Sequence, residues 1–146
     1  MAVYTEINRE QLDKFLSSYD LGEVVSFSGI TEGVENSNYL LSTTEGKYIL
    51  TVYEKRVKSS DLPFYLGLMD HLANFGIPCP TPVAGHDGLI LRKIENKSAA
   101  IVTFLTGLWP KRPRPVHCYE LGKAMAKMHS AGIDYNIRKP NELGLE

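Results

Sequence analysis

Residues 29–39 read GITEGVENSNY, and the fold of the whole chain depends on the structure that this stretch adopts. It lies between two strand-like runs, Val24–Phe27 and Asn38–Leu41. Its glycines tolerate positive φ angles, and its asparagine and serine side chains can donate hydrogen bonds. Such a loop could direct backbone N–H groups at an anion such as a nucleotide phosphate. A long hairpin turn has the same composition, and composition alone favours the turn.

Two common nucleotide-binding motifs are excluded for this stretch. It contains neither the GxxxxGKS/T pattern of a P-loop nor the GxGxxG pattern of a dinucleotide-binding fold. A site here would therefore have to use a different glycine-containing hairpin.

The neighbouring segments predict a mixed chain of helices and antiparallel strands. A capping box at Asn8–Gln11 begins a helix that continues to Tyr19 and ends before Gly22. Three strands fill Glu23–Tyr53, and the seven residues from Lys47 form the third. We expect a second helix that ends at Gly76, with Pro63 in its first turn.

The second half of the sequence predicts a hairpin, a linker and a last helix. The hairpin strands are Leu89–Ile94 and Ala99–Leu105, joined around Glu95–Lys97. A proline-rich basic linker, Gly107–Pro115, leads to a helix over His117–Ala131. That helix carries Leu121, Ala124, Met125 and Met128 on one face.

Composition limits the function. The 146 residues are 43% hydrophobic and carry a net charge of −1, which argues for a folded domain and against a dedicated nucleic-acid binder. No apolar run approaches the roughly 18–20 residues of a membrane helix, and no secretory signal is visible. Cys79 and Cys118 form neither a disulfide framework nor a CxxC metal pair. We expect a soluble, cytoplasmic protein that binds neither nucleic acid nor membrane, with no metal-ligand cluster in this chain.

The order of these elements is that of the N-terminal lobe of a kinase. In that layout the first hairpin covers the nucleotide phosphates, and the last strand leads into a hinge that holds adenine through main-chain groups. Thr103–Gly107 occupies the hinge position. An ordinary edge strand that ends at a glycine explains this segment equally well.

Several segments resemble the bacterial homoserine kinases of the aminoglycoside phosphotransferase and choline kinase superfamily. Two of the matching segments are Glu32–Tyr39 and, later in the chain, Ile49–Arg56. Gly76–Pro82, Ala99–Gly107 and His117–His129 also fit, and the resemblance extends over about Val3–Ile133. It implies a fold with a protein-kinase-like N-terminal lobe, which is a five-stranded antiparallel sheet plus helix of the α+β class, then a hinge and the first helix of a C-terminal lobe.

The resemblance implies ATP and magnesium as cofactors and assigns site residues. Those expected over the ATP phosphates are Gly33, Glu35, Asn36, Ser37 and Asn38, and those expected at adenine are Thr103, Phe104 and Leu105. Many related folds place a phosphate-contacting lysine on the third strand. Here Thr51 stands at that position, and Lys47, Lys55 and Arg56 do not simply inherit the role.

Acidic and basic residues near these positions are further candidates. Glu54, with the Asn36–Asn38 segment, is the strongest. Asp61 is the acid nearest the second helix, and we expect it to cap that helix. We expect His129 to have a packing role and both cysteines to be free thiols. Lys111, Arg112 and Arg114 are better explained as a solvated linker surface.

The pattern His-x-Asp-x-x-x-x-Asn, which the resemblance leads us to expect after the last helix, is not found. Asp134 is the only aspartate there, and neither Asn136 nor Asn141 restores the spacing. We therefore expect no catalytic base and no metal ligands in this chain. The expectation is an N-terminal portion of a longer kinase, with a lobe over 1–106 and a hinge plus the start of a truncated C-terminal lobe over 107–146.

The function implied by the resemblance is ATP:L-homoserine O-phosphotransferase activity in threonine biosynthesis. The chain alone would be inactive, and its last helix could expose an apolar face that supports self-association. Two alternatives remain: another small-alcohol phosphotransferase of the same superfamily, and a non-catalytic association module.

Overall fold

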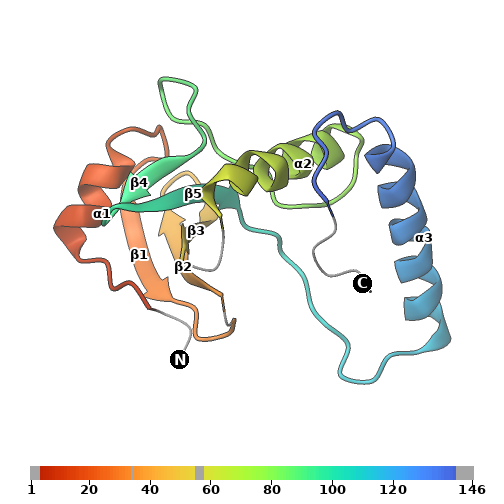
Figure 1. Ribbon diagram of the computed structural model, residues 1–146. Coiled ribbons are helices and arrows are strands. Elements are labelled where there is room, and N and C mark those ends of the chain that lie inside the picture. The colour runs from red at the N-terminus through yellow and green to blue at the C-terminus, as the bar shows by residue number, and fades with distance from the viewer. Residues whose placement is uncertain (1–3, 34, 55–57, 141–146) are drawn as a thin grey trace.

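The computed structural model describes residues 4–33, 35–54 and 58–140. One antiparallel sheet of five strands in the order β1-β2-β3-β5-β4 forms its centre (Figure 1). The strands are β1 (Val24–Gly29), β2 (Asn36–Thr43), β3 (Lys47–Tyr53), β4 (Arg92–Ile94) and β5 (Lys97–Thr103). The five-stranded antiparallel sheet predicted from the sequence is confirmed.

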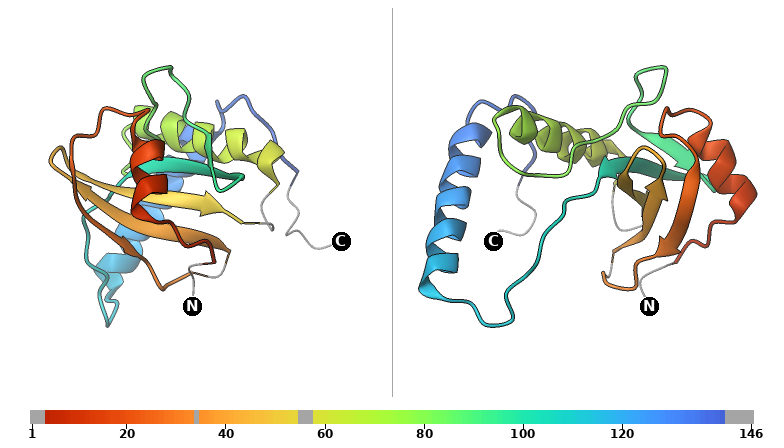
Figure 2. Two further views of the ribbon diagram at one scale, coloured as in Figure 1. Left: turned by 90° about the vertical axis from the view of Figure 1, so that its left-hand side faces the viewer. Right: turned by 180° about the vertical axis from the view of Figure 1, so that it is seen from behind.

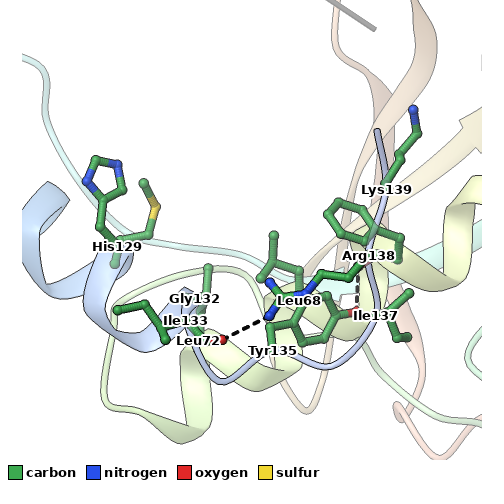
Figure 3. Close-up of a pocket in the computed structure, with 11 residues that line it drawn as sticks. Leu68, Leu72, His129, Gly132, Ile133, Tyr135, Ile137, Arg138 and Lys139 are labelled. Atoms are coloured by element: carbon green, nitrogen blue, oxygen red, sulfur yellow. Dashed lines mark hydrogen bonds between the residues drawn. The ribbon is translucent and has the colours of Figure 1, made fainter. Parts of the chain in front are cut away.

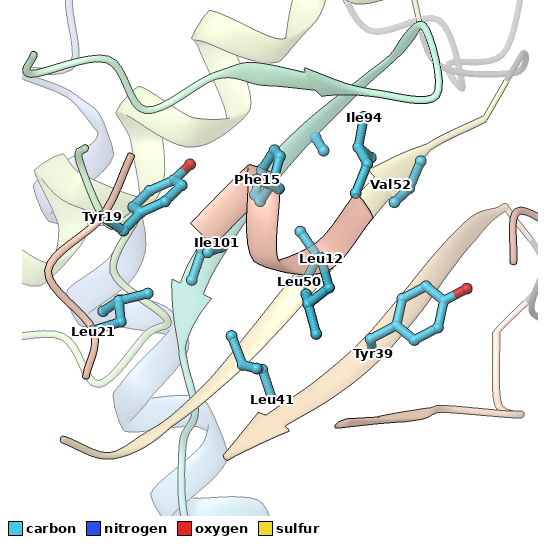
Figure 4. Close-up of a cluster of buried hydrophobic side chains, with 11 residues drawn as sticks. Leu12, Phe15, Tyr19, Leu21, Tyr39, Leu41, Leu50, Val52, Ile94 and Ile101 are labelled. Carbon is cyan, nitrogen blue, oxygen red and sulfur yellow. The ribbon is translucent and has the colours of Figure 1, made fainter. Parts of the chain in front are cut away.

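Helix α1 (Arg9–Leu16) covers one face of the sheet and forms the main core with it (Figure 4). Leu12 and Phe15 from the helix pack against side chains of the sheet that include Leu50 and Ile101. The predicted capping box is present, since Asn8 and Gln11 each accept a hydrogen bond from the other's backbone N–H.

Helix α1 is shorter than the sequence predicts. It ends at Leu16 rather than Tyr19, because the Ser17 hydroxyl donates to the Lys14 carbonyl and competes with helical continuation. Tyr19 still reaches the same core from the turn that follows.

Helix α2 (Leu62–Asn74) lies against the opposite face, where Leu66 packs on Ala100 and Val102. A three-residue 3-10 turn, η1 (Ser59–Asp61), precedes it. Gly76 adopts φ +72°, and the N–H groups of Gly76 and Ile77 donate to Ala73 and Leu72. The helix therefore ends next to Gly76, as the sequence predicts. Figure 2 shows α1 and α2 on the two sides of the sheet.

Strand β4 also begins later than expected, at Arg92 rather than Leu89. A turn takes up the preceding residues: Gly88 has φ +78°, and Leu89 N–H donates to the Asp87 carboxylate while its carbonyl accepts from Gly85. These bonds replace the ladder that residues 89–91 would otherwise have formed.

Helix α3 (Pro115–Gly132) stands apart from the sheet at the far end of α2, reached by residues 104–114 (Figure 1). It meets α2 where His71 Nε2 lies 2.8 Å from the Ala131 carbonyl. The predicted apolar face is exposed, with Leu121 62% and Met125 45% accessible. Among the described residues, no helix combines the length and apolarity needed to cross a membrane.

Candidate functional site

The two faces of β2 divide the residues predicted to contact phosphate. Successive side chains of a strand point to opposite faces. Ser37 lies fully buried on the α1 side, in step with Tyr39. Asn36 and Asn38 lie half-buried on the α2 side. The sequence places these three residues together, but the structure brings only the two asparagines to one face.

Thr51 and Asn38 are direct partners across β2 and β3. The Thr51 hydroxyl donates to Asn38 Oδ1 over 2.9 Å. The backbone of Asn38 also closes the preceding turn, because its carbonyl accepts from Ile30 N–H at 2.8 Å. Two predicted site residues are thus joined by a hydrogen bond on the α2 side of the sheet.

Gly33 lies in the turn between β1 and β2, next to this pair. It has φ +117°, a conformation that favours glycine. A Cβ at this position would lie 3.8 Å from Asn38 Nδ2. The backbone of Gly33 therefore lies near the Asn38 amide.

Ser37 takes part in a polar cluster that holds the N-terminal segment on the sheet. Its hydroxyl accepts from the N–H groups of Tyr4 (2.8 Å) and Thr5 (3.0 Å) and donates to Glu54 Oε1 (2.7 Å). Thr5 Oγ1 donates to the same carboxylate oxygen over 2.6 Å, and Lys97 Nζ donates to Glu54 Oε2 over 2.5 Å. We refer to Thr5, Ser37, Glu54 and Lys97 as the Glu54 cluster.

The protonation of Glu54 follows from this cluster. Burial alone would raise the pKa of its carboxyl, but hydrogen bonds from Lys97, Thr5 and Ser37 outweigh that effect and hold the pKa below its ordinary value. The side chain is only 12% exposed. Glu54 and Ser37, both expected at the site, are therefore used to fasten the fold.

The remaining phosphate candidates lie at the edge of the turn. Asn36 Oδ1 accepts from Glu54 N–H over 3.4 Å, which is a long contact. Glu35 is exposed. Asn36 lies on the α2 side of the sheet but is held less firmly than Asn38.

The structure also shows where the nearby lysines lie. Lys47 is exposed at the start of β3, and Lys55 and Arg56 fall outside the described residues. Lys97, which sequence reasoning missed, reaches the end of β3 from β5 and pairs with Glu54. It lies 43 positions from Glu54 in sequence, so only the strand register could have revealed the pair.

The expected hinge begins where β5 ends. Thr103 still pairs with Tyr48, and Phe104 N–H donates to the Lys47 carbonyl over 3.1 Å. Leu105 then leaves the ladder, and within the part of the chain that the structure describes its N–H has no protein acceptor. Phe104 and Leu105 are 38% and 47% exposed. This segment offers a backbone donor beside apolar surface.

Asp61 does not cap α2 as expected. It stands at the N-cap position, but its backbone has helical angles and its side chain accepts no capping hydrogen bond. The preceding 3-10 turn gives Asp61 helical backbone angles, and its half-buried carboxylate pairs with Lys139 at 3.3 Å. Asp61 thus connects α2 with the segment that follows α3.

A separate apolar pocket of about 510 Å³ lies between α2 and the segment after α3 (Figure 3). Leu72, Met128 and Tyr135 are among the residues that line it, and His129 and Arg138 are polar members of the lining. Of the weaker candidates, only His129 lies here. Lys111, Arg112 and Arg114 are exposed, as expected.

The sulfur chemistry agrees with the sequence. Both cysteines are free thiols, Cys79 half-buried and Cys118 exposed. The Cys79 thiol donates to the Met69 carbonyl. Within the described ranges, no three His, Cys, Asp or Glu side chains gather into a group that could hold a metal ion.

Comparison with known sequences gives consistent matches. A sequence model of the phosphotransferase enzyme family matches residues 26–143. The homoserine kinase of Bradyrhizobium diazoefficiens is 54% identical over 145 residues, which are 99% of this chain and 44% of that protein. The homoserine kinase of Granulibacter bethesdensis is 56% identical and covers 100% of this chain and 46% of that protein. The chain thus spans less than half the length of these relatives.

Solved structures resemble the fold. A spectinomycin phosphotransferase in complex with ADP and spectinomycin superposes with a TM-score of 0.66 at 14% identity, over 87% of this chain and 39% of that one. An aminoglycoside phosphotransferase from Alicyclobacillus acidocaldarius gives 0.63 at 13% identity, over 89% and 36%. The likeness confirms the predicted kinase-like lobe.

Proposed function

The chain belongs to the phosphotransferase enzyme family, and we propose that the full-length protein is a homoserine kinase. It transfers the γ-phosphoryl group of ATP to the side-chain hydroxyl of L-homoserine. The observation that carries this proposal is the 54% identity to a homoserine kinase over 145 residues. The Thr51–Asn38 pair belongs to the matched region and lies on the α2 side of the sheet.

The described residues supply the nucleotide-positioning part of this reaction. Phosphoryl transfer is catalysed mainly by positioning and by electrostatic stabilisation of the transferred group. We assign the turn at Gly33, with Glu35, Asn36 and Asn38, to the ATP phosphates. Thr51 supports Asn38 from the neighbouring strand. Ser37 and Glu54 lie on the opposite face, where they hold the N-terminal segment on the sheet.

Adenine binding is assigned to the segment at the end of β5. The N–H of Leu105 is a donor for a ring nitrogen, and the exposed side chains of Phe104 and Leu105 are apolar surface for the ring faces. Thr103 fixes the start of this segment, because its hydroxyl accepts from Thr81 N–H over 2.9 Å.

Residues 1–106 then act as an N-terminal lobe, and 107–146 as the hinge and the start of a second lobe. Magnesium, when bound with ATP, neutralises charge on the phosphates. Within the described ranges, no three His, Cys, Asp or Glu side chains form a group that could hold a metal ion. We assign the magnesium ligands and the group that orients the homoserine hydroxyl to residues outside the described ranges.

The test compares acceptors in the full-length protein. ADP release is measured with MgATP and, separately, L-homoserine, L-serine, choline and spectinomycin. L-serine is one methylene shorter, which in a fitted pocket costs about 10–200-fold in kcat/KM. We expect homoserine to exceed every other acceptor. A higher kcat/KM for another alcohol would reassign the substrate, and no ADP release with any acceptor would contradict kinase activity.

A further inference from the structure

We propose that the Asn38 side-chain amide, oriented by Thr51, donates a hydrogen bond to the ATP phosphates. In this chain that hydrogen bond replaces the phosphate contact that a lysine on the third strand makes in many related folds. The proposal rests on the proposed function, since it concerns the same nucleotide site. It assigns Asn38 as a binding residue and Thr51 as its positioning residue.

The hydrogen bond from Thr51 fixes which way the amide faces. An asparagine side chain has one acceptor oxygen and an NH₂ group with two donors, held in a plane. Because Thr51 Oγ1 donates to Oδ1 over 2.9 Å, the oxygen is directed at β3. Nδ2 is therefore directed away from β3, towards Gly33.

The turn places a glycine, which has no side chain, beside Nδ2. Even a Cβ added to Gly33 would remain 3.8 Å from the amide nitrogen. The carbonyl of Asn38 accepts from Ile30 N–H, which holds the strand in place. Within the described residues, no acceptor is recorded for the NH₂ group of Asn38. A phosphate oxygen can accept a hydrogen bond from a neutral NH₂ group.

Ser37, Lys97 and Lys47 are bonded or placed elsewhere. The Ser37 hydroxyl already makes three hydrogen bonds on the α1 side. Lys97 is bonded to Glu54 and Thr5. Lys47 starts β3, four residues before Thr51, which is about 13 Å along a strand. Among the described residues close to Gly33 on the α2 side, Asn38 is the donor that the geometry favours.

A neutral donor should position the phosphates without contributing charge. Removing this NH₂ donor therefore weakens ATP binding and leaves homoserine binding largely intact. Placing a carboxylate at the same point would repel the phosphates, which is a larger effect.

The test uses isosteric variants of the full-length protein. Asn38→Asp replaces NH₂ by an anionic oxygen, and Thr51→Val removes the orienting hydroxyl at constant shape. Thr51→Ser tests rescue, since it restores the hydroxyl. Ser42→Ala is the matched control, because Ser42 lies on the same face of β2 at its other end, opposite Lys47. ATP dissociation constants are measured by calorimetry, and KM values for ATP and homoserine by ADP release.

We expect N38D to weaken ATP binding by at least about tenfold, as loss of a hydrogen bond to a charged group does. T51V should raise KM for ATP with little change in KM for homoserine, T51S should recover most of that loss, and S42A should match the parent. Unchanged ATP affinity in either N38D or T51V would overturn the inference.

Failure of the inference and failure of the proposed function are distinguishable. If the parent protein binds ATP but does not phosphorylate homoserine, the proposed function fails while the calorimetric comparison still decides the role of Asn38. If the parent phosphorylates homoserine and T51V is indistinguishable from it, the inference alone fails. Melting temperatures of all variants identify loss of folding, and T51V remains decisive if N38D does not fold.

Discussion

Glu54 and Lys97 form an ion pair that joins the end of β3 to the start of β5, on the face of the sheet opposite Thr51 and Asn38. The pair shares its carboxylate with Thr5 and Ser37, so one side chain holds the N-terminal segment, β2 and β5 together. Tyr39 adds a hydrogen bond from its hydroxyl to the Thr5 carbonyl. The sheet thus has a structural face and a proposed nucleotide face, separated by one strand layer.

Replacing Glu54 by Gln should lower the free energy of unfolding at pH 7 by about 1–3 kcal/mol, the range for hydrogen bonds to a charged group. The folded-state pKa of Glu54 lies below its ordinary value of 4.5. Its contribution is therefore complete above pH 4.5 and is lost as the pH falls through the folded-state pKa. Urea unfolding at several pH values measures this. A parent-minus-variant difference that stays constant as the medium is acidified would contradict the assignment.

Replacing Ser37 by Ala should destabilise the fold without weakening ATP binding. The change leaves the N–H groups of Tyr4 and Thr5 without their acceptor, at a cost of about 1–3 kcal/mol. Denaturant unfolding and an ATP titration on the same preparation separate the two properties. A tenfold loss of ATP affinity at unchanged stability would return Ser37 to the nucleotide site.

Replacing Asp61 tests the correction to its role. If Asp61 capped α2, Asn would substitute for it well and Ala would not. Because its carboxylate instead pairs with Lys139, we expect Asp61→Asn and Asp61→Ala to lower stability equally, by up to about 1 kcal/mol. Thermal unfolding compares them, and an Asn variant as stable as the parent would support capping.

The hairpin between β4 and β5 should be improved by Asn96→Gly. Glu95 and Asn96 have φ of 48° and 60°, the positive pair of a two-residue type I′ turn, whose second position favours glycine. We expect a net gain of about 0.5 kcal/mol in the free energy of unfolding, because the greater freedom of glycine in the unfolded chain offsets part of the benefit. Unfolding experiments measure it, and a loss of stability would show that the Asn96 side chain makes a needed contact.

Sequence patterns predicted the elements well because local rules govern them. The capping box at Asn8, the stop at Gly76 and the Glu95–Asn96 turn each depend on residues within one turn of chain. Element ends were less predictable, as at Leu16 and Arg92, where side-chain and turn hydrogen bonds compete with the regular ladder.

The candidate site was only partly predictable, because it depends on contacts between distant residues. Sequence order groups Asn36, Ser37 and Asn38, whereas strand alternation assigns Ser37 to the other face. Glu54 was expected at the site, but Lys97, 43 residues away in the sequence, binds its carboxylate. Neither the register nor the Lys139–Asp61 pair has a local signal.

The central claim is that ATP phosphates bind on the α2 side of the sheet, against Asn38. A crystal structure of the full-length protein with magnesium and a non-hydrolysable ATP analogue measures the distance from Asn38 Nδ2 to the nearest phosphate oxygen. The account predicts a hydrogen bond of about 3 Å, with the Glu54–Lys97 pair intact on the opposite face. Phosphates bound to Lys97, or beyond hydrogen-bond reach of Asn38, would contradict it.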